Sequence, residues 1–183
     1  MDLTNHFLIA MPGMADPHFS KTVTLVCSHD SSGAMGIVIN RPSALTLDSV
    51  LEQMDIATEA EITGDMPVFH GGPVLQERGF VLHRPIGEWE SCLSVSDDIA
   101  VATSKDILAA VAVGQGPSNV LVALGYAGWG AGQLEDEFVQ NAWLSGPANA
   151  EVIFTAPVEQ RWQLAAKLLG VDVDRLSSQA GHA

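Results

Sequence analysis

Cys27 and His29 are the two residues whose types and spacing most directly predict covalent chemistry. In an extended strand, residues i and i+2 point to the same face, with Cα atoms roughly 7 Å apart. An imidazolium beside the thiol would lower the thiol pKa from its reference of about 8.5 and give a reactive thiolate. Val23, Leu25 and Cys27 also alternate as a buried face would. Two hypotheses for Cys27 therefore stay open, an inert packing residue and a reactive thiol.

The run Ser28-His29-Asp30 has the composition of a hydrolase triad without its geometry. Successive side chains of a strand point to opposite faces, so His29 would point away from both neighbours. The sequence contains no G-x-S-x-G elbow, no H-E-x-x-H pattern and no paired-cysteine spacing. We therefore predict no metal, no cofactor and no complete catalytic set, which favours a protein that is not an enzyme.

A glycine-rich segment with aromatic residues follows the apolar run 119–124 and precedes a helix predicted to begin near Gln133. The spacing fits neither a dinucleotide fingerprint nor a P-loop, and three acidic residues at 135–137 oppose a polyanion. We interpret residues 125–132 as a loop whose aromatic side chains either contact a partner or fill the core. The candidate ligand or partner surface consists of Tyr126, Gly128, Trp129, Gly130, Gln133, Glu135 and Trp143.

A second glycine motif, HGGPV at 70–74, predicts a tight turn between strands. Backbone N–H groups in such a turn can form a nest for an anion. Gly71, Gly72 and Arg78 are the candidate residues for this nest.

The charge balance excludes whole classes of partner. The chain of 183 residues has 22 acidic and 8 basic residues, a formal net charge of −14. The basic residues are scattered, so we predict no direct nucleic-acid binding and no membrane binding. The partner is then an unidentified protein or small ligand, and the mean hydropathy of +0.21 leaves a homo-oligomer possible. Two cysteines without framework spacing, and no signal peptide, predict a cytoplasmic location.

Hydrophobic periodicity predicts which elements position these residues. Strands are expected at 7–10, 22–27, 34–40, 67–70, 79–83, 91–95, 99–103, 119–124 and 151–155. Helices are expected after Thr46, over 105–113 behind Ser104, near Gln133, and after Pro157. The order predicts an α+β fold, a single compact domain over 1–183 with a mixed β-sheet core and about four flanking helices, similar to an α/β sandwich.

Several segments together resemble the YqgE/AlgH family of bacterial proteins. They are FLIAMPGM, GAMGIVINRP at 33–42, HGGPV at 70–74, RGFVLH at 78–83, GYAGWGAGQLEDE at 125–137, NAWL at 141–144 and RWQLAAKLLGVD. The resemblance implies a compact α+β cytoplasmic domain and carries a regulator label with no established activity. Where the family's pattern reads Cys-Glu-His-Asn, this chain has Cys27-Ser28-His29-Asp30, so a role that depends on that glutamate does not carry over.

Two hypotheses of function follow. The first is a non-enzymatic binding or regulatory domain that acts through a protein partner or small ligand, including indirect transcriptional regulation, with its contact surface between Tyr126 and Glu137. The second is a thiol-based redox sensor or enzyme that uses Cys27 with His29.

Overall fold

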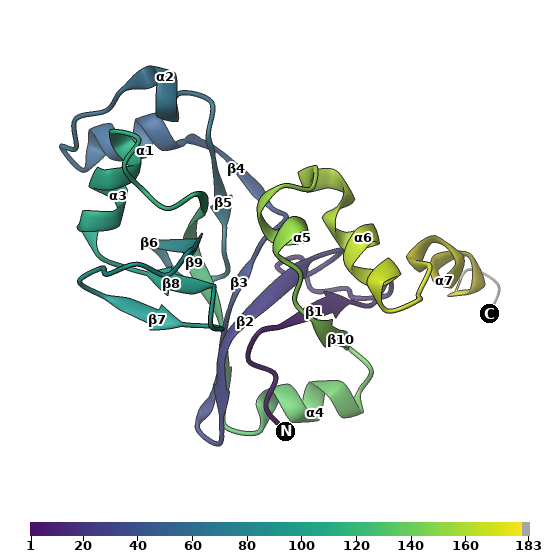
Figure 1. Cartoon of the computed structure of the whole chain (residues 1–183). Helices are drawn as coiled ribbons and strands as arrows, with labels where there is room; N and C mark the ends of the chain where they lie inside the picture. The colour runs from purple at the N-terminus through teal and green to yellow at the C-terminus, as the bar shows by residue number, and fades with distance from the viewer. Residues whose placement is uncertain (181–183) are drawn as a thin grey trace.

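Ten strands form one curled sheet in the computed structural model, which describes residues 1–180 (Figure 1). The strands are β1 (His6–Ala10), β2 (Val23–Asp30), β3 (Gly33–Val38), β4 (Pro42–Thr46), β5 (Pro67–His70), β6 (Val74–Arg84), β7 (Cys92–Ser94), β8 (Ala100–Ala102), β9 (Asn119–Gly130) and β10 (Trp143–Pro147). Their order is β10-β1-β2-β3-β9-β6-β8-β7, and β5 lies between β4 and β9. The β5–β9 pairing is parallel and the others are antiparallel, which confirms the predicted mixed sheet.

Helices cover both faces of this sheet. They are α1 (Leu47–Gln53), α2 (Ala60–Thr63), α3 (Lys105–Ala112), α4 (Gln133–Val139), α5 (Ala150–Phe154), α6 (Arg161–Leu168) and α7 (Val173–Ala180), with a 3-10 turn at Val158–Gln160. The described part of the chain has seven α-helices instead of the predicted four, because α2 and α5, which are only about one turn long, and α7 were not predicted. The α+β class is confirmed. No helix among residues 1–180 is long and apolar enough to cross a membrane.

Strand alternation sends neighbouring side chains to two separate cores. On one face, Leu82 and Leu121 pack with residues of α5, α6 and α7. On the other face, Val81 and Val122 pack with α1 and α3, and a third cluster packs against α4. We call these the α5–α6 face and the opposite face. Figure 1 shows α5–α7 on one side of the sheet and α1–α3 on the other.

The helix boundaries follow the capping residues that the sequence indicated. The Thr46 hydroxyl accepts a hydrogen bond from the Ser49 amide at the start of α1. Ser104 precedes α3, although its hydroxyl donates to Asp106 instead of capping the helix, and Gly114 follows α3 with φ +75°.

Two predicted elements are wrong. Residues 151–155 form most of α5 instead of a strand, because the Asn149 side chain accepts from the Val152 amide and starts a helix there. The predicted glycine-rich loop is largely strand, since β9 continues to Gly130 by pairing with β3. The apolar residues of both segments predict burial, but they do not show which hydrogen-bond partners each backbone has in the fold.

Candidate functional site

A β-bulge at Cys27 resets the alternation of β2. Val26 pairs with Gly36 and Ser28 pairs with Met35, so Cys27 is an additional residue with no partner in β3. Cys27 therefore packs in the core of the α5–α6 face, whereas His29, two residues later, pairs with Ala34 on the opposite face. The prediction that Cys27 and His29 share a face is wrong, because it assumed an uninterrupted strand.

Cys27 has the environment of a packing residue. Its side chain is 1% exposed, and its Sγ lies 3.6 Å from the Leu25 carbonyl oxygen. Burial raises the pKa of the Cys27 thiol to about 12, because a thiolate would lose its hydration there. The predicted reactive thiol pair Cys27–His29 is not assembled. The other cysteine, Cys92, is exposed.

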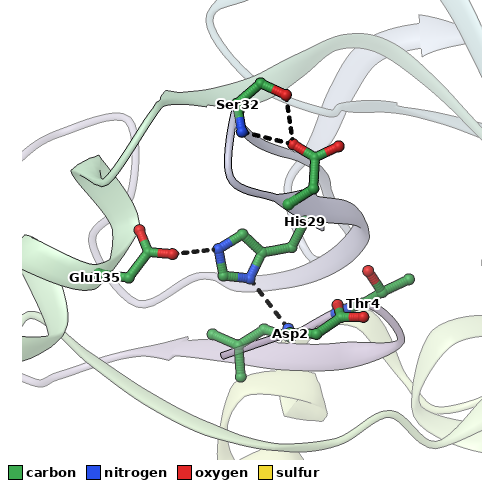
Figure 2. Close-up of polar contacts among 7 residues, drawn as sticks. Asp2, Thr4, His29, Ser32 and Glu135 are labelled. Atoms are coloured by element: carbon green, nitrogen blue, oxygen red, sulfur yellow. Dashed lines mark hydrogen bonds and ion pairs between the residues drawn. The ribbon is translucent and has the colours of Figure 1, made fainter.

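His29 instead connects three segments on the opposite face (Figure 2). Its Nδ1 accepts a hydrogen bond from the Leu3 amide at 3.1 Å, so in the neutral ring the proton is on Nε2. Nε2 donates to Glu135 Oε1 at 2.7 Å. The Glu135 backbone amide and then His29 hold the pKa of the Glu135 carboxyl below its usual value. His29 and Glu135 thus join the N-terminal segment, β2 and α4, and neither lines the groove described below.

A second irregularity lies in β9 at Gly125, which has φ +79°. Before it, Val122 faces α1 and α3; after it, Tyr126 packs on the α5–α6 face. A residue with φ in this region breaks the regular alternation, and glycine adopts it without steric cost. A side chain at 125 would also meet the Gly72 carbonyl oxygen at 2.4 Å. Gly125 therefore directs Tyr126 to the α5–α6 face.

The predicted anion nest at Gly71, Gly72 and Arg78 is not formed. The Gly71 N–H donates to the Leu124 carbonyl at 2.8 Å, so it is unavailable to an anion. A Cβ at Gly72 would lie 2.1 Å from the Tyr126 carbonyl carbon. These two glycines allow the chain to cross β9 at close range. Arg78 lies apart from this crossing, at the exposed start of β6.

The third irregularity is in β6. Val74 pairs with Tyr126 and Gly79 with Leu124, so residues 75–78 bulge out of the sheet. Leu75, at φ +48°, is 55% exposed, and Arg78 is exposed as well. Bulges of this kind are common beside functional sites because they redirect side chains.

Together the three irregularities form an open groove of about 480 Å³ on the part of the α5–α6 face that the helices leave uncovered. Phe80 and Tyr126 meet edge-to-face, with ring centroids 5.5 Å apart. The Arg78 guanidinium carbon lies 6.0 Å from the Phe80 ring centroid. A recess of about 260 Å³ shares Met35, Phe80 and Thr103 with the groove and extends it to β7. The groove is lined by Ser28, Asp30, Ser32, Gly33, Ala34, Met35, Leu75, Arg78, Phe80, Thr103, Tyr126 and Trp129.

The groove has the chemistry of a binding site. Its charged lining residues are Asp30 and Arg78, and its hydroxyl groups come from Ser28, Ser32, Thr103 and Tyr126. The Ser32 hydroxyl and amide donate to Asp30 Oδ1 at 2.7 and 2.8 Å and hold the pKa of the Asp30 carboxyl below its usual value. No histidine lines the groove, and no group of three His, Cys, Asp or Glu suited to a metal occurs among the described residues.

The predicted surface from Tyr126 to Trp143 is divided between the two faces. Tyr126 and Trp129 both line the groove, although Trp129 is only 6% exposed, whereas Trp143 is 4% exposed and does not line it. The rings of Trp129 and Trp143 pack with Phe19 at centroid distances of 6.1 and 5.5 Å. Burial raises the pKa of the adjacent Glu137 carboxyl, against the opposing influence of the two indole N–H groups. Both tryptophans pack in the core beneath α4, so the predicted contact surface is wrong at Trp143, whereas Trp129 also lines the groove.

The glycines of this segment are exposed but not free loops. Gly128 and Gly130 lie in β9, and the Gly130 amide donates to the Gln133 side-chain oxygen at 3.0 Å. Gln133 is the first residue of α4 and ties that helix to the strand.

Sequence reasoning missed the groove's floor. Met35, Phe80 and Leu75 were not selected as site residues, although Phe80 and Leu82 alternate on one face of the segment RGFVLH. That alternation marks an inward face but does not show that helices leave part of it uncovered. No sequence pattern indicated the bulges that bring Ser28 and Arg78 to the same groove.

Comparisons with known proteins match one family over nearly the whole chain. A family model described as AlgH-like matches residues 7–174. A UPF0301 protein of Nitrosococcus oceani is 56% identical over 179 residues, 98% of this chain and 96% of the relative. A UPF0301 protein of Thioalkalivibrio sulfidiphilus is 58% identical over 182 residues, 100% of this chain and 97% of the relative.

Two solved structures share the fold. The solution structure of the AlgH protein from Pseudomonas aeruginosa matches with a TM-score of 0.83 and 49% identity, covering 100% of this chain and 97% of that one. A crystal structure of a Corynebacterium diphtheriae protein matches with a TM-score of 0.74 at 18% identity, covering 96% and 91%. The curled sheet with helices on both faces is therefore a fold already seen by experiment.

Proposed function

The chain belongs to the AlgH-like family, and we propose that it is a non-enzymatic binding domain whose groove receives a small ligand or a short segment of a protein partner. The observation that carries this proposal is the open groove around Tyr126, which combines an aromatic floor with a few polar groups at its walls. Binding sites commonly have this composition, with apolar surface for affinity and polar groups for orientation.

The same groove offers no activated nucleophile. Ser28 lines it, but His29 projects to the opposite face and is engaged by Leu3 and Glu135. A hydroxyl without a base within hydrogen-bond reach is a weak nucleophile at neutral pH. The Ser32 hydroxyl donates to Asp30, but the pKa of that carboxyl lies below its usual value, which makes it a poor general base. The thiol alternative has no support either, because Cys27 is buried. Binding is therefore the function that the groove supports best.

Indirect regulation of transcription and a cytoplasmic location are also part of this proposal. The charge of −14 argues against direct DNA binding, so any transcriptional effect would be indirect, through a protein that senses whether the groove is occupied. Two unpaired cysteines fit the reducing cytoplasm.

A fragment and peptide screen read by amide chemical shifts tests the proposal. Binding compounds should shift the amide signals of Met35, Phe80, Thr103 and Tyr126 in common. Ser28→Tyr places a large side chain in the groove without altering the core, and it should abolish these shifts. Ser118→Tyr, in an exposed loop outside the groove, is the matched control and should retain them.

Two results would count against a binding groove. One is a screen whose hits all map outside the groove lining. The other is unchanged binding by the Ser28→Tyr variant, provided that its amide spectrum shows an intact fold.

A further inference from the structure

We propose that the ligand of the groove is an apolar monocarboxylate, and that Arg78 is the residue that pairs with its carboxylate. This inference rests on the proposed binding function of the groove and adds the chemical class of the ligand.

The first observation is that the Arg78 side chain has no hydrogen bond or ion pair within the described part of the chain. Its recorded contact is with the Phe80 ring, which holds the guanidinium above the groove floor. In contrast, Arg84 pairs with Asp98, and Arg41 and Arg161 donate to backbone carbonyls. The guanidinium N–H donors of Arg78 therefore remain available at the groove, although the chain has 22 acidic residues that could have paired with them.

The second observation concerns the size of the ligand's charge. Arg78 is the single cation among the groove's lining residues, and Asp30 on the β2–β3 wall is negative. Asp30 and Arg78 do not form an ion pair with each other. A ligand with several negative charges would meet one favourable charge, one unfavourable charge and the repulsion of a −14 chain. A single carboxylate fits this balance.

The third observation concerns the body of the ligand. Phe80, Tyr126, Met35 and Leu75 give the groove an apolar floor and rim next to Arg78. A carboxylate bound by Arg78 would bring its substituent over these side chains. An aromatic or branched aliphatic substituent would bury apolar surface there, which acetate cannot do.

Amide chemical-shift titrations with 3-phenylpropionate, its neutral analogue 3-phenylpropanamide, and acetate test this inference. The wild-type groove should bind the acid more tightly than the amide, by up to about fivefold, the difference expected from one exposed ion pair. Acetate should bind more weakly than the phenyl acid. Arg78→Gln should remove the preference for the acid, and Arg78→Lys should retain part of it. Lys167→Gln removes the same charge from the exposed surface of α6 and should leave the preference intact.

The outcomes separate this inference from the proposed function. Equal binding of acid and amide, or an acid preference that survives Arg78→Gln, overturns the role of Arg78 and leaves the groove a binding site. Absence of groove shifts with the acid overturns the carboxylate class, and the fragment screen then decides independently whether the groove binds anything. A preference equally reduced by Lys167→Gln would show only the effect of net charge and would also overturn the inference.

Discussion

The folded protein should protect Cys27 from alkylation by a very large factor. An ordinary cysteine thiol, with a pKa of 9.0, is about one-tenth thiolate at pH 8. With its pKa raised to about 12, Cys27 is thiolate in about one molecule in 10,000. The thiolate population alone therefore lowers its rate roughly a thousandfold, before the 1% exposure of the side chain is considered.

Iodoacetamide labelling at pH 8, followed by mass spectrometry of each cysteine, measures this protection. Cys92 is the internal reference; burial and then the Asp106 carboxylate raise the pKa of Cys92, but its side chain is exposed. Cys92 should be modified while Cys27 stays unmodified, and both should react in urea. Labelling of Cys27 in the folded protein at a rate comparable with Cys92 would refute the assignment of Cys27 to the core.

Three further predictions concern stability. Trp129→Ala should lower the free energy of unfolding by about 3–5 kcal/mol in a urea titration, because it leaves a cavity in the core. Tyr126 is half-buried, so Tyr126→Ala should lower the free energy of unfolding clearly less. Equal losses for the two variants would contradict the assignment of Trp129 to the core. Gly72→Ala should destabilise the protein strongly, because the new Cβ would overlap the backbone of β9. Gly79→Ala has no atom within 4 Å of the new Cβ and should change the unfolding free energy by about 0.5 kcal/mol or less. A Gly72→Ala variant as stable as Gly79→Ala would disprove the close crossing. Burial raises the pKa of the Glu137 carboxyl, so its contribution to stability is present below the unfolded-state pKa and is lost as the pH rises through the folded-state pKa. Glu137→Gln should therefore raise the melting temperature at pH 7 and lose this advantage near pH 4. The opposite trend would contradict the sign of the pKa shift.

Much of the fold could be predicted from the sequence because it depends on local patterns. The β2–β3 hairpin, the Thr46 cap, the start of α3 after Ser104, and the helix near Gln133 each follow from a few neighbouring residues. The segment 151–155 shows the limit. Its apolar, β-branched sequence predicts a strand, but the cap from Asn149 and packing against α6 make it helical.

The candidate site could not be predicted in the same way. Sequence alternation predicts that Cys27 and His29 share one face. Cys27 itself has no partner in β3, and this bulge puts the two side chains on opposite faces. Tyr126 was predicted in the contact region and lines the groove, but Gly125 determines which face of the sheet Tyr126 joins. Whether an aromatic residue lies in a groove or a core depends on which helices cover that face, and this depends on residues distant in sequence. The family resemblance identified the fold, and it assigned no groove.

The most direct test of the account is the fluorine NMR spectrum of protein in which tyrosine is replaced by 3-fluorotyrosine. The chain has one tyrosine, Tyr126, so the spectrum reports one site, at the floor of the groove. Titration with a compound that binds the protein should shift this resonance in the wild type and leave it unchanged in a Ser28→Phe variant, which fills the groove without adding a second tyrosine. A compound that binds both proteins equally without moving the resonance would show that recognition occurs elsewhere, and the groove would not be the functional site.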